Sequence, residues 1–172
     1  MPACPYYFRI PGIYNDVEAA PLLCAGPIGY RALKMAECRS GRNLRFWRRS
    51  LYCCPKPVLQ GRKLFGFTRP GDTVAQDFAS KMSAMWVGGS DMMPSEELDA
   101  AIIFAPVGVL VPAALRVIRP GGVVVCGGIH MSHIPAFPYD ILWREKRLVS
   151  VANLTRRDAE EFLTLTPKVS SG

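Results

Sequence analysis

Four turn segments could bind a ligand, because each follows an apolar run of the length typical of a buried β-strand. They are Thr68-Arg69, Ala105-Pro106-Val107-Gly108, Gly127-Gly128-Ile129-His130 and Asn153-Leu154-Thr155-Arg156. In parallel α/β sheets, ligands bind beyond the carboxyl ends of the strands. We therefore predict that these segments form a binding edge, with glycines that admit a ligand closely or simply make the turns.

Cysteine thiolates are the second kind of group that could do chemistry. The chain has six, namely Cys4, Cys24, Cys38, Cys53, Cys54 and Cys126. None stand in a CxxC pair, so neither a thioredoxin motif nor a zinc ribbon is present. A disulfide between the adjacent Cys53 and Cys54 would be strained. We expect free thiols in a reducing compartment.

A basic segment accounts for the net charge of +7. Eight basic residues and no acid lie between Cys38 and Lys63, and the rest of the chain is close to neutral. Phe46, Trp47 and Tyr52 interrupt the arginines. Residues 39–63 therefore offer one alternative function, a nucleic-acid-binding module that combines charge with stacking aromatics.

The elements that would position these groups alternate between strand and helix. Apolar periodicity and capping residues predict four helical segments: Asp16 to Met35, broken by Gly26-Pro27; Thr73–Ala84; Leu110–Val117; and a helix that is capped by Asp158 and ends at Leu165. Short apolar runs bounded by turn residues predict four strands: Lys63–Phe67, Glu96 or Leu98 to Ala105, Val123–Cys126 and Leu148–Ala152. Residues 37–62 show neither helical nor strand periodicity.

This alternation predicts the fold class. Short strands that are apolar throughout, separated by helices, indicate an α/β fold with a doubly wound, Rossmann-like parallel sheet. The tryptophans Trp47, Trp86 and Trp143 are interpreted as packing residues. The longest apolar stretch, Ala100–Val111, is too short to span a bilayer, and no signal peptide is evident, so we expect a cytoplasmic protein without a membrane partner.

Five motifs occur in the order found in one enzyme family. They are Glu18 to Leu33, with its Leu23-Cys24-Ala25-Gly26 core, Phe67 to Asp72, Leu98 to Gly108, Arg119 to Ile129, and Asn153 to Asp158. Together they resemble the zinc-dependent alcohol dehydrogenases of the medium-chain type over nearly everything except residues 38–62. The resemblance implies that residues 1–36 are a linker or hinge from a catalytic domain and that residues 37–172 are a damaged dinucleotide-binding domain.

The resemblance also implies roles for site residues. In the family the cysteine that matches Cys24 binds the catalytic zinc, a Lewis acid that would lower the pKa of the alcohol. The other ligands come from a domain that this sequence does not contain, so we expect that this chain does not hold zinc and that Cys24 is a small buried residue.

For the cofactor NAD(P), the residues implied are Thr68, Arg69, Pro106, Val107, Gly108, Gly127, Gly128, Ile129 and Arg156. Arg69 stands where an acidic residue would bind a ribose 2′-hydroxyl, and an arginine there suits a 2′-phosphate, which favours NADP. Alternatively, Arg69 is a solvated arginine in a turn. For Arg156, the alternative is that it simply forms an exposed pair with Arg157.

The family's glycine-rich phosphate-binding turn is missing from the basic segment. One permitted coding string for residues 42–56, read one base later, encodes Gly-Ile-Tyr-Gly-Phe-Gly-Ala-Ala-Ala-Tyr-Ile-Val-Ala-Gln. This peptide contains the required Gly-x-Gly-x-x-Ala turn. Trp47 followed by Arg48 forces one of its glycines in any coding. We hypothesise that residues 40–60 are translated out of frame, which would remove the first strand and leave the sheet incomplete.

The predicted function is that of a truncated, NAD(P)-dependent, zinc-dependent alcohol dehydrogenase with little or no activity of its own. Its substrate in the intact family would be a small alcohol or aldehyde. The nucleic-acid-binding module is the alternative, although a shifted reading frame removes the need for such a partner. Two further hypotheses are that the chain is a dimerisation or regulatory partner of an intact paralogue and that it forms a homo-oligomer.

Overall fold

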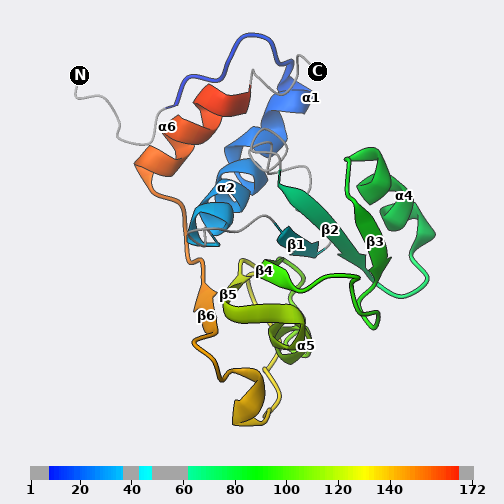
Figure 1. Ribbon diagram of the computed structural model, residues 1–172. Helices are drawn as coiled ribbons and strands as arrows, with labels where there is room; N and C mark the ends of the chain where they lie inside the picture. Colours follow the sequence, from blue (N-terminus) through cyan, green and yellow to red (C-terminus); the bar gives the residue numbers. More distant parts are fainter. Residues whose placement is uncertain (1–7, 37–42, 48–61, 167–172) are drawn as a thin grey trace.

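The computed structural model describes residues 8–36, 43–47 and 62–166 (Figure 1). Its strands are β1 Asn43–Trp47, β2 Lys63–Thr68, β3 Trp86–Gly89, β4 Leu98–Ile103, β5 Ile118–Cys126 and β6 Arg147–Ser150. They form one six-stranded sheet in the order β3-β2-β1-β4-β5-β6, and every adjacent pair is parallel. The predicted α/β fold with a parallel sheet is confirmed.

The strand order shows how the sheet is wound. The chain proceeds outward from β1 through β2 to β3, then returns to the other side of β1 and proceeds outward from β4 through β5 to β6. The direction reverses between β1 and β4, where doubly wound folds have their ligand crevice. This is the order of a Rossmann-type dinucleotide-binding sheet.

The prediction that the basic segment would remove the central strand was wrong for residues 43–47. These residues form β1, and Phe46 lies opposite Gly66 of β2 on one side and Ile102 of β4 on the other. Two neighbouring strands offer hydrogen-bond partners on both sides, and such tertiary context outweighs weak local periodicity. The remainder of the hypothetical out-of-frame segment, residues 40–42 and 48–60, lies outside the described residues.

The helices are α1 Asp16–Ala19, the 3₁₀ helix η1 Ala20–Leu23, α2 Ala25–Met35, α4 Thr73–Lys81, α5 Leu110–Val117, the 3₁₀ helix η3 Tyr139–Ile141 and α6 Arg156–Leu165. The predicted break at Gly26-Pro27 was wrong. The chain breaks at Cys24, whose φ of −133° and ψ of −72° are not helical. Pro27 is in the first turn of α2, where a backbone N–H has no intrahelical partner to lose.

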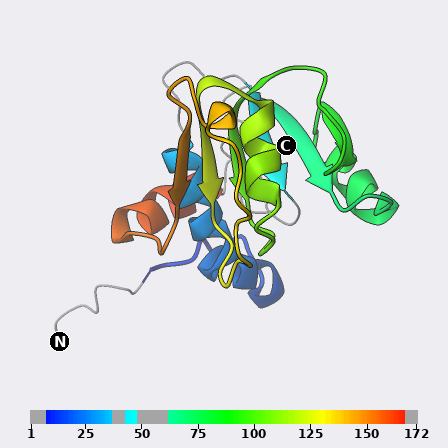
Figure 2. The same ribbon diagram turned by 90° about the horizontal axis from the view of Figure 1, so that it is seen from below.

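Helices cover both faces of the sheet (Figures 1 and 2). On one face, Ala114 and Leu115 of α5 belong to the same core cluster as Phe67 and Val124. On the other face, Leu33 of α2 shares a core with residues of β2, β4 and β5. All six residues of β4 are buried. This confirms for β4 the prediction of a strand that is covered on both faces.

The strand β3 was missed by the sequence analysis. It is four residues long, ends in Gly88-Gly89 and lies at the edge of the sheet, so it has neither the length nor the apolar run that indicates a strand. Trp86 anchors it, with its ring centroid 4.7 Å from that of Phe67. The prediction that Trp86 is a packing residue is confirmed, whereas that for the Trp47 side chain stays a prediction.

Two further boundaries differ from the predicted ones. The N-cap of α6 is Thr155, and Asp158 is the third helical residue of a capping box rather than the cap. β5 begins at Ile118, before the Gly121 turn, whereas the prediction began the strand at Val123. The proposed domain boundary between residues 36 and 37 stays a prediction, although α2 shares a core with the sheet. Among the described residues no helix is long and apolar enough to cross a membrane.

Candidate functional site

The four predicted turn segments follow β2, β4, β5 and β6. Because these strands are parallel, the segments lie at the same edge of the sheet, its carboxyl edge. The contacts of each segment decide whether its groups are available to a ligand or already used within the protein. Their roles as cofactor-binding residues stay predictions.

The turn after β2 combines a buried hydroxyl with an exposed cation. Thr68 is 3% exposed, and its Oγ1 donates to the carbonyl oxygen of Arg69 at 3.1 Å and accepts from Nε2 of Gln76 at 3.2 Å. Arg69 is exposed, and the described residues provide it with no ion-pair partner. Thr68 therefore holds the turn, while the guanidinium of Arg69 is available to a phosphate.

The turn after β4 is closed by the segment that follows β5. The backbone N–H of Gly108 donates to Oγ of Ser132 at 2.8 Å, and the N–H of Ser132 donates to the carbonyl oxygen of Pro106 at 3.3 Å. A Cβ at Gly108 would collide with the carbonyl oxygen of His133. A glycine is therefore required here by protein packing. Val107 is 41% exposed.

The glycines after β5 also pack against the protein. The N–H of Gly127 donates to the carbonyl oxygen of Ile103 at 2.8 Å, and a Cβ on Gly127 would lie 2.9 Å from the ring of Phe104. A Cβ on Gly128 would lie 2.9 Å from the carbonyl oxygen of Phe104. Ile129 is 76% exposed. The close approach that these glycines permit is made by the strand-end segment of β4.

Arg156 begins α6, beyond the end of β6. Its Nε donates to Oε1 of Glu160 at 2.7 Å, and its guanidinium carbon lies 5.9 Å from the centroid of the Phe8 ring. Its side chain is half-exposed at 51%. A ligand at Arg156 would compete with these two protein contacts.

A buried carboxylate that the sequence analysis did not recognise holds α6 against α2. Asp158 is fully buried, and its carboxylate lies 3.0 Å from Nζ of Lys34 and 3.3 Å from Nη1 of Arg31. Burial raises the pKa of Asp158, but hydrogen bonds from Thr155 and the charge of Lys34 outweigh it and leave the pKa below its usual range. The Thr155-x-x-Asp158 spacing was the sequence signal for this anchor.

Glu161 extends the same cluster. Lys34, Arg157 and Tyr30 all donate to its carboxylate, at 2.9, 2.7 and 2.8 Å. These bonds lower the pKa of Glu161 to about 2. The hydrogen bond to Glu161, followed by that to Asp158, raises the pKa of Lys34. The cluster thus fixes where α6 begins, and with it the position of Arg156.

Cys24 lies at the junction of η1 and α2 and is exposed, so the expectation of a small buried residue was wrong. The helical hydrogen-bond pattern is interrupted at this residue, and its side chain is left at the surface rather than in the core that α2 shares with the sheet. Over the described ranges, no group of three or more His, Cys, Asp and Glu side chains gathers as a metal site would require.

The comparisons with known proteins agree with this fold. The chain is 38% identical to the "Probable alcohol dehydrogenase AdhA" of Mycobacterium tuberculosis over 158 residues, an alignment that covers 90% of this chain and 45% of the relative. The chain therefore spans about half the length of this curated relative. No family model matches.

Two solved structures illustrate the structural likeness. Acetophenone reductase from Geotrichum candidum in complex with NAD superposes with a TM-score of 0.78 at 18% identity, over 94% of this chain and 48% of that one. CAD from Helicobacter pylori complexed with NADP(H) gives a TM-score of 0.73 at 20% identity, over 88% and 45%. At these identities the likeness concerns the fold.

Proposed function

We propose that the chain is the nucleotide-binding part of an NAD(P)-dependent alcohol dehydrogenase, because it is 38% identical to a probable alcohol dehydrogenase over 158 residues, about half of that relative's length. The observation that carries the proposal is the strand order β3-β2-β1-β4-β5-β6, which gathers the four turn segments at one edge. The cofactor would supply a hydride acceptor for a small alcohol, or a hydride donor for an aldehyde.

The residues at the carboxyl edge fit a dinucleotide in part. Arg69 is exposed and suits a 2′-phosphate, which supports NADP over NAD. Val107 and Ile129 offer exposed apolar surface at the ends of β4 and β5 for the nicotinamide end. The backbone N–H of Gly108, in contrast, already donates to Ser132.

The described residues do not bring together the ligands that a catalytic zinc requires. Cys24 is exposed, and among the described residues no set of three ligands gathers. We therefore derive no step through zinc, and we propose that the chain by itself turns over little or no alcohol.

The phosphate-binding turn is the decisive missing part. A dinucleotide needs backbone N–H groups in a tight glycine turn after β1, and the residues that follow Trp47 are Arg48, Arg49 and Ser50. We keep the proposal that this segment is read out of frame. The alternative frame of the permitted coding string encodes the Gly-x-Gly-x-x-Ala turn at positions 45–50, so the turn would begin within the residues that form β1 here.

Nucleotide titration of two proteins tests both proposals. The chain as it stands and a variant that carries the alternative-frame peptide in place of residues 42–55 are titrated with NADPH and NADH by calorimetry. We expect at least tenfold tighter binding by the variant, with NADPH preferred, and loss of that preference in Arg69→Gln. Arg147→Gln, an exposed arginine at the start of β6, is the control. Absence of binding by both proteins would refute the nucleotide site.

The nucleic-acid alternative has less support. Residues 43–47 are paired on both sides in the centre of the sheet, so their backbone is not a free loop that could follow a strand of nucleic acid. Lys63 is paired with Glu96 at 2.7 Å. A homo-oligomer is a further proposal, which sedimentation of the purified chain would test.

A further inference from the structure

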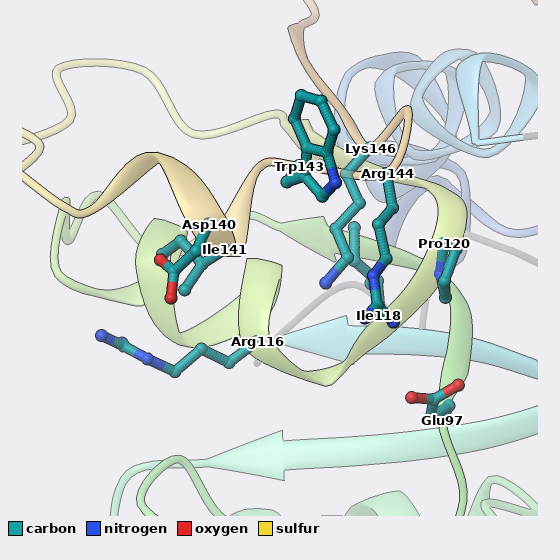
Figure 3. A pocket seen from close by; sticks show the side chains of 9 residues that line it. All are labelled: Glu97, Arg116, Ile118, Pro120, Asp140, Ile141, Trp143, Arg144 and Lys146. Carbon is teal, nitrogen blue, oxygen red and sulfur yellow. The ribbon is translucent and has the colours of Figure 1, made fainter.

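A cavity lies at the amino edge of the sheet, opposite the edge that carries the four turn segments (Figure 3). Its volume is about 370 Å³, and it is lined by the starts of β5 and β6, the end of α5 and the loop that contains η3. We infer that this cavity is a binding site for a small aromatic anion, a planar ring that carries a carboxylate or a phosphate.

The charge of the lining points to an anion. Arg116, Arg144 and Lys146 line the cavity together with two carboxylates, those of Glu97 and Asp140. Among the described residues, neither Arg116 nor Arg144 has an ion-pair partner. Figure 3 shows the side chains of Arg144 and Lys146 running alongside each other toward Ile118, while Arg116 extends the other way. Within the described part of the chain, Arg144 therefore lines the cavity with no carboxylate at ion-pair distance, and the lining carries three cations and two carboxylates.

Lys146 is already engaged by the protein. Its Nζ donates to the carbonyl oxygen of Leu115 at 2.8 Å, near the C-terminal end of α5. Burial lowers the pKa of Lys146, the charge of Glu97 raises it and that of Arg144 lowers it. Because Arg144 and Lys146 line the same cavity and run alongside each other (Figure 3), an anion at Arg144 would also be attracted by Lys146.

The backbone at Arg144 supports a role for this side chain. Arg144 and Glu145 have φ values of 67° and 60°, a conformation that favours glycine. The carbonyl oxygen of Arg144 accepts from the N–H of Gly121 at 2.9 Å, which holds the strained turn in place. Strained residues of this kind are concentrated at functional sites.

The remaining walls favour a planar ring. Trp143, Ile118, Ile141 and Pro120 line the cavity, so an inorganic anion would leave apolar surface unused. Trp143 is 58% exposed, and its ring lies edge-on to Tyr139 with centroids 5.6 Å apart. The prediction that Trp143 is a packing residue holds only for this contact with Tyr139. Its exposed face can stack on an aromatic ligand.

Calorimetric titration of the full chain with benzoate and phenyl phosphate tests the site. Benzamide, which lacks the charge, and inorganic phosphate, which lacks the ring, are the control ligands. We expect one or both aromatic anions to bind at least tenfold more tightly than either control. Preference for benzoate or for phenyl phosphate distinguishes a carboxylate site from a phosphate site.

Two glycine variants separate binding from stability. Arg144→Gly and Glu145→Gly each relieve a positive φ, but only Arg144 lines the cavity. Both should unfold at or above the wild-type temperature, and only Arg144→Gly should weaken binding of the aromatic anion, by about tenfold or more. Arg144→Asn provides a second neutral variant that tolerates this backbone. Failure of both aromatic anions to bind, equal binding by Arg144→Gly, or equal binding of the controls would overturn the site.

Discussion

Removal of the buried carboxylate between α2 and α6 should destabilise the protein more than any comparable surface change. In Asp158→Ala, the capping interaction with Thr155 is lost, which costs about 1 kcal/mol. Loss of one partner of a buried ion pair typically costs about 3–5 kcal/mol. Lys34 and Arg31 have side chains that are 26% and 33% exposed and can regain water, which reduces this second cost. We therefore expect a total of about 2–3 kcal/mol.

The measurement is thermal or denaturant unfolding of matched variants. A loss of this size corresponds to a decrease of roughly 5–10 °C in Tm for a chain of this length. Asp158→Asn keeps an acceptor for the N–H of Thr155 and loses only the charge, so it should lie between wild type and Asp158→Ala. Asp77→Ala, on the exposed face of α4, is the control and should stay within about 0.5 kcal/mol of wild type. The reasoning is refuted if Asp158→Ala is no less stable than Asp77→Ala.

Three other predictions concern single groups. The folded-state pKa of Glu161, about 2, lies below its ordinary value of 4.5. The ionised carboxylate therefore stabilises the fold above pH 4.5, and this contribution is lost as the pH falls toward 2. In an acid-unfolding curve, Glu161→Gln should reduce the dependence of stability on pH in this range. Gly108→Ala should lower the free energy of unfolding by roughly 1–3 kcal/mol, because the added Cβ would meet the carbonyl oxygen of His133. Gly12→Ala, whose Cβ would have no atom within 4 Å, is the control and should not lower it. Chemical denaturation measures both. Iodoacetamide should modify the exposed Cys24 before Cys126, because burial raises the pKa of the Cys126 thiol. Peptide mapping over time measures the order, and earlier modification of Cys126 would contradict the prediction.

The parts of the fold that could be predicted are those with long apolar runs. β4, α5 and the main part of β5 follow directly from Leu98–Val125, where apolar periodicity and the turns at Pro106 and Gly121 agree. β3 was missed because Trp86–Gly89 is short and glycine-rich, and β1 was missed because pairing with two neighbours, not local pattern, determines it. Tertiary context decides such segments.

The position of the candidate site could be predicted from the sequence. Which of its polar groups are already hydrogen-bonded within the protein could not. Strand ends can be read from the sequence, and they place Arg69, Gly108 and Gly127 at one edge. Which groups are free depends on contacts between distant segments, such as Ser132 with Gly108, and no local pattern indicates them. The amino-edge cavity is a further example, because its lining comes from residues 97 to 146 and is assembled only by the fold.

These contacts explain why the strand order alone does not make a nucleotide site. The winding of the sheet reverses between β1 and β4, yet the N–H groups of Gly108 and Gly127 are already bonded to Ser132 and Ile103. The phosphates of a dinucleotide must then be held chiefly by the turn after β1. Arginine side chains attract phosphate but do not replace a row of backbone N–H groups. Under our proposal, nucleotide binding therefore requires the alternative-frame peptide in place of residues 42–55.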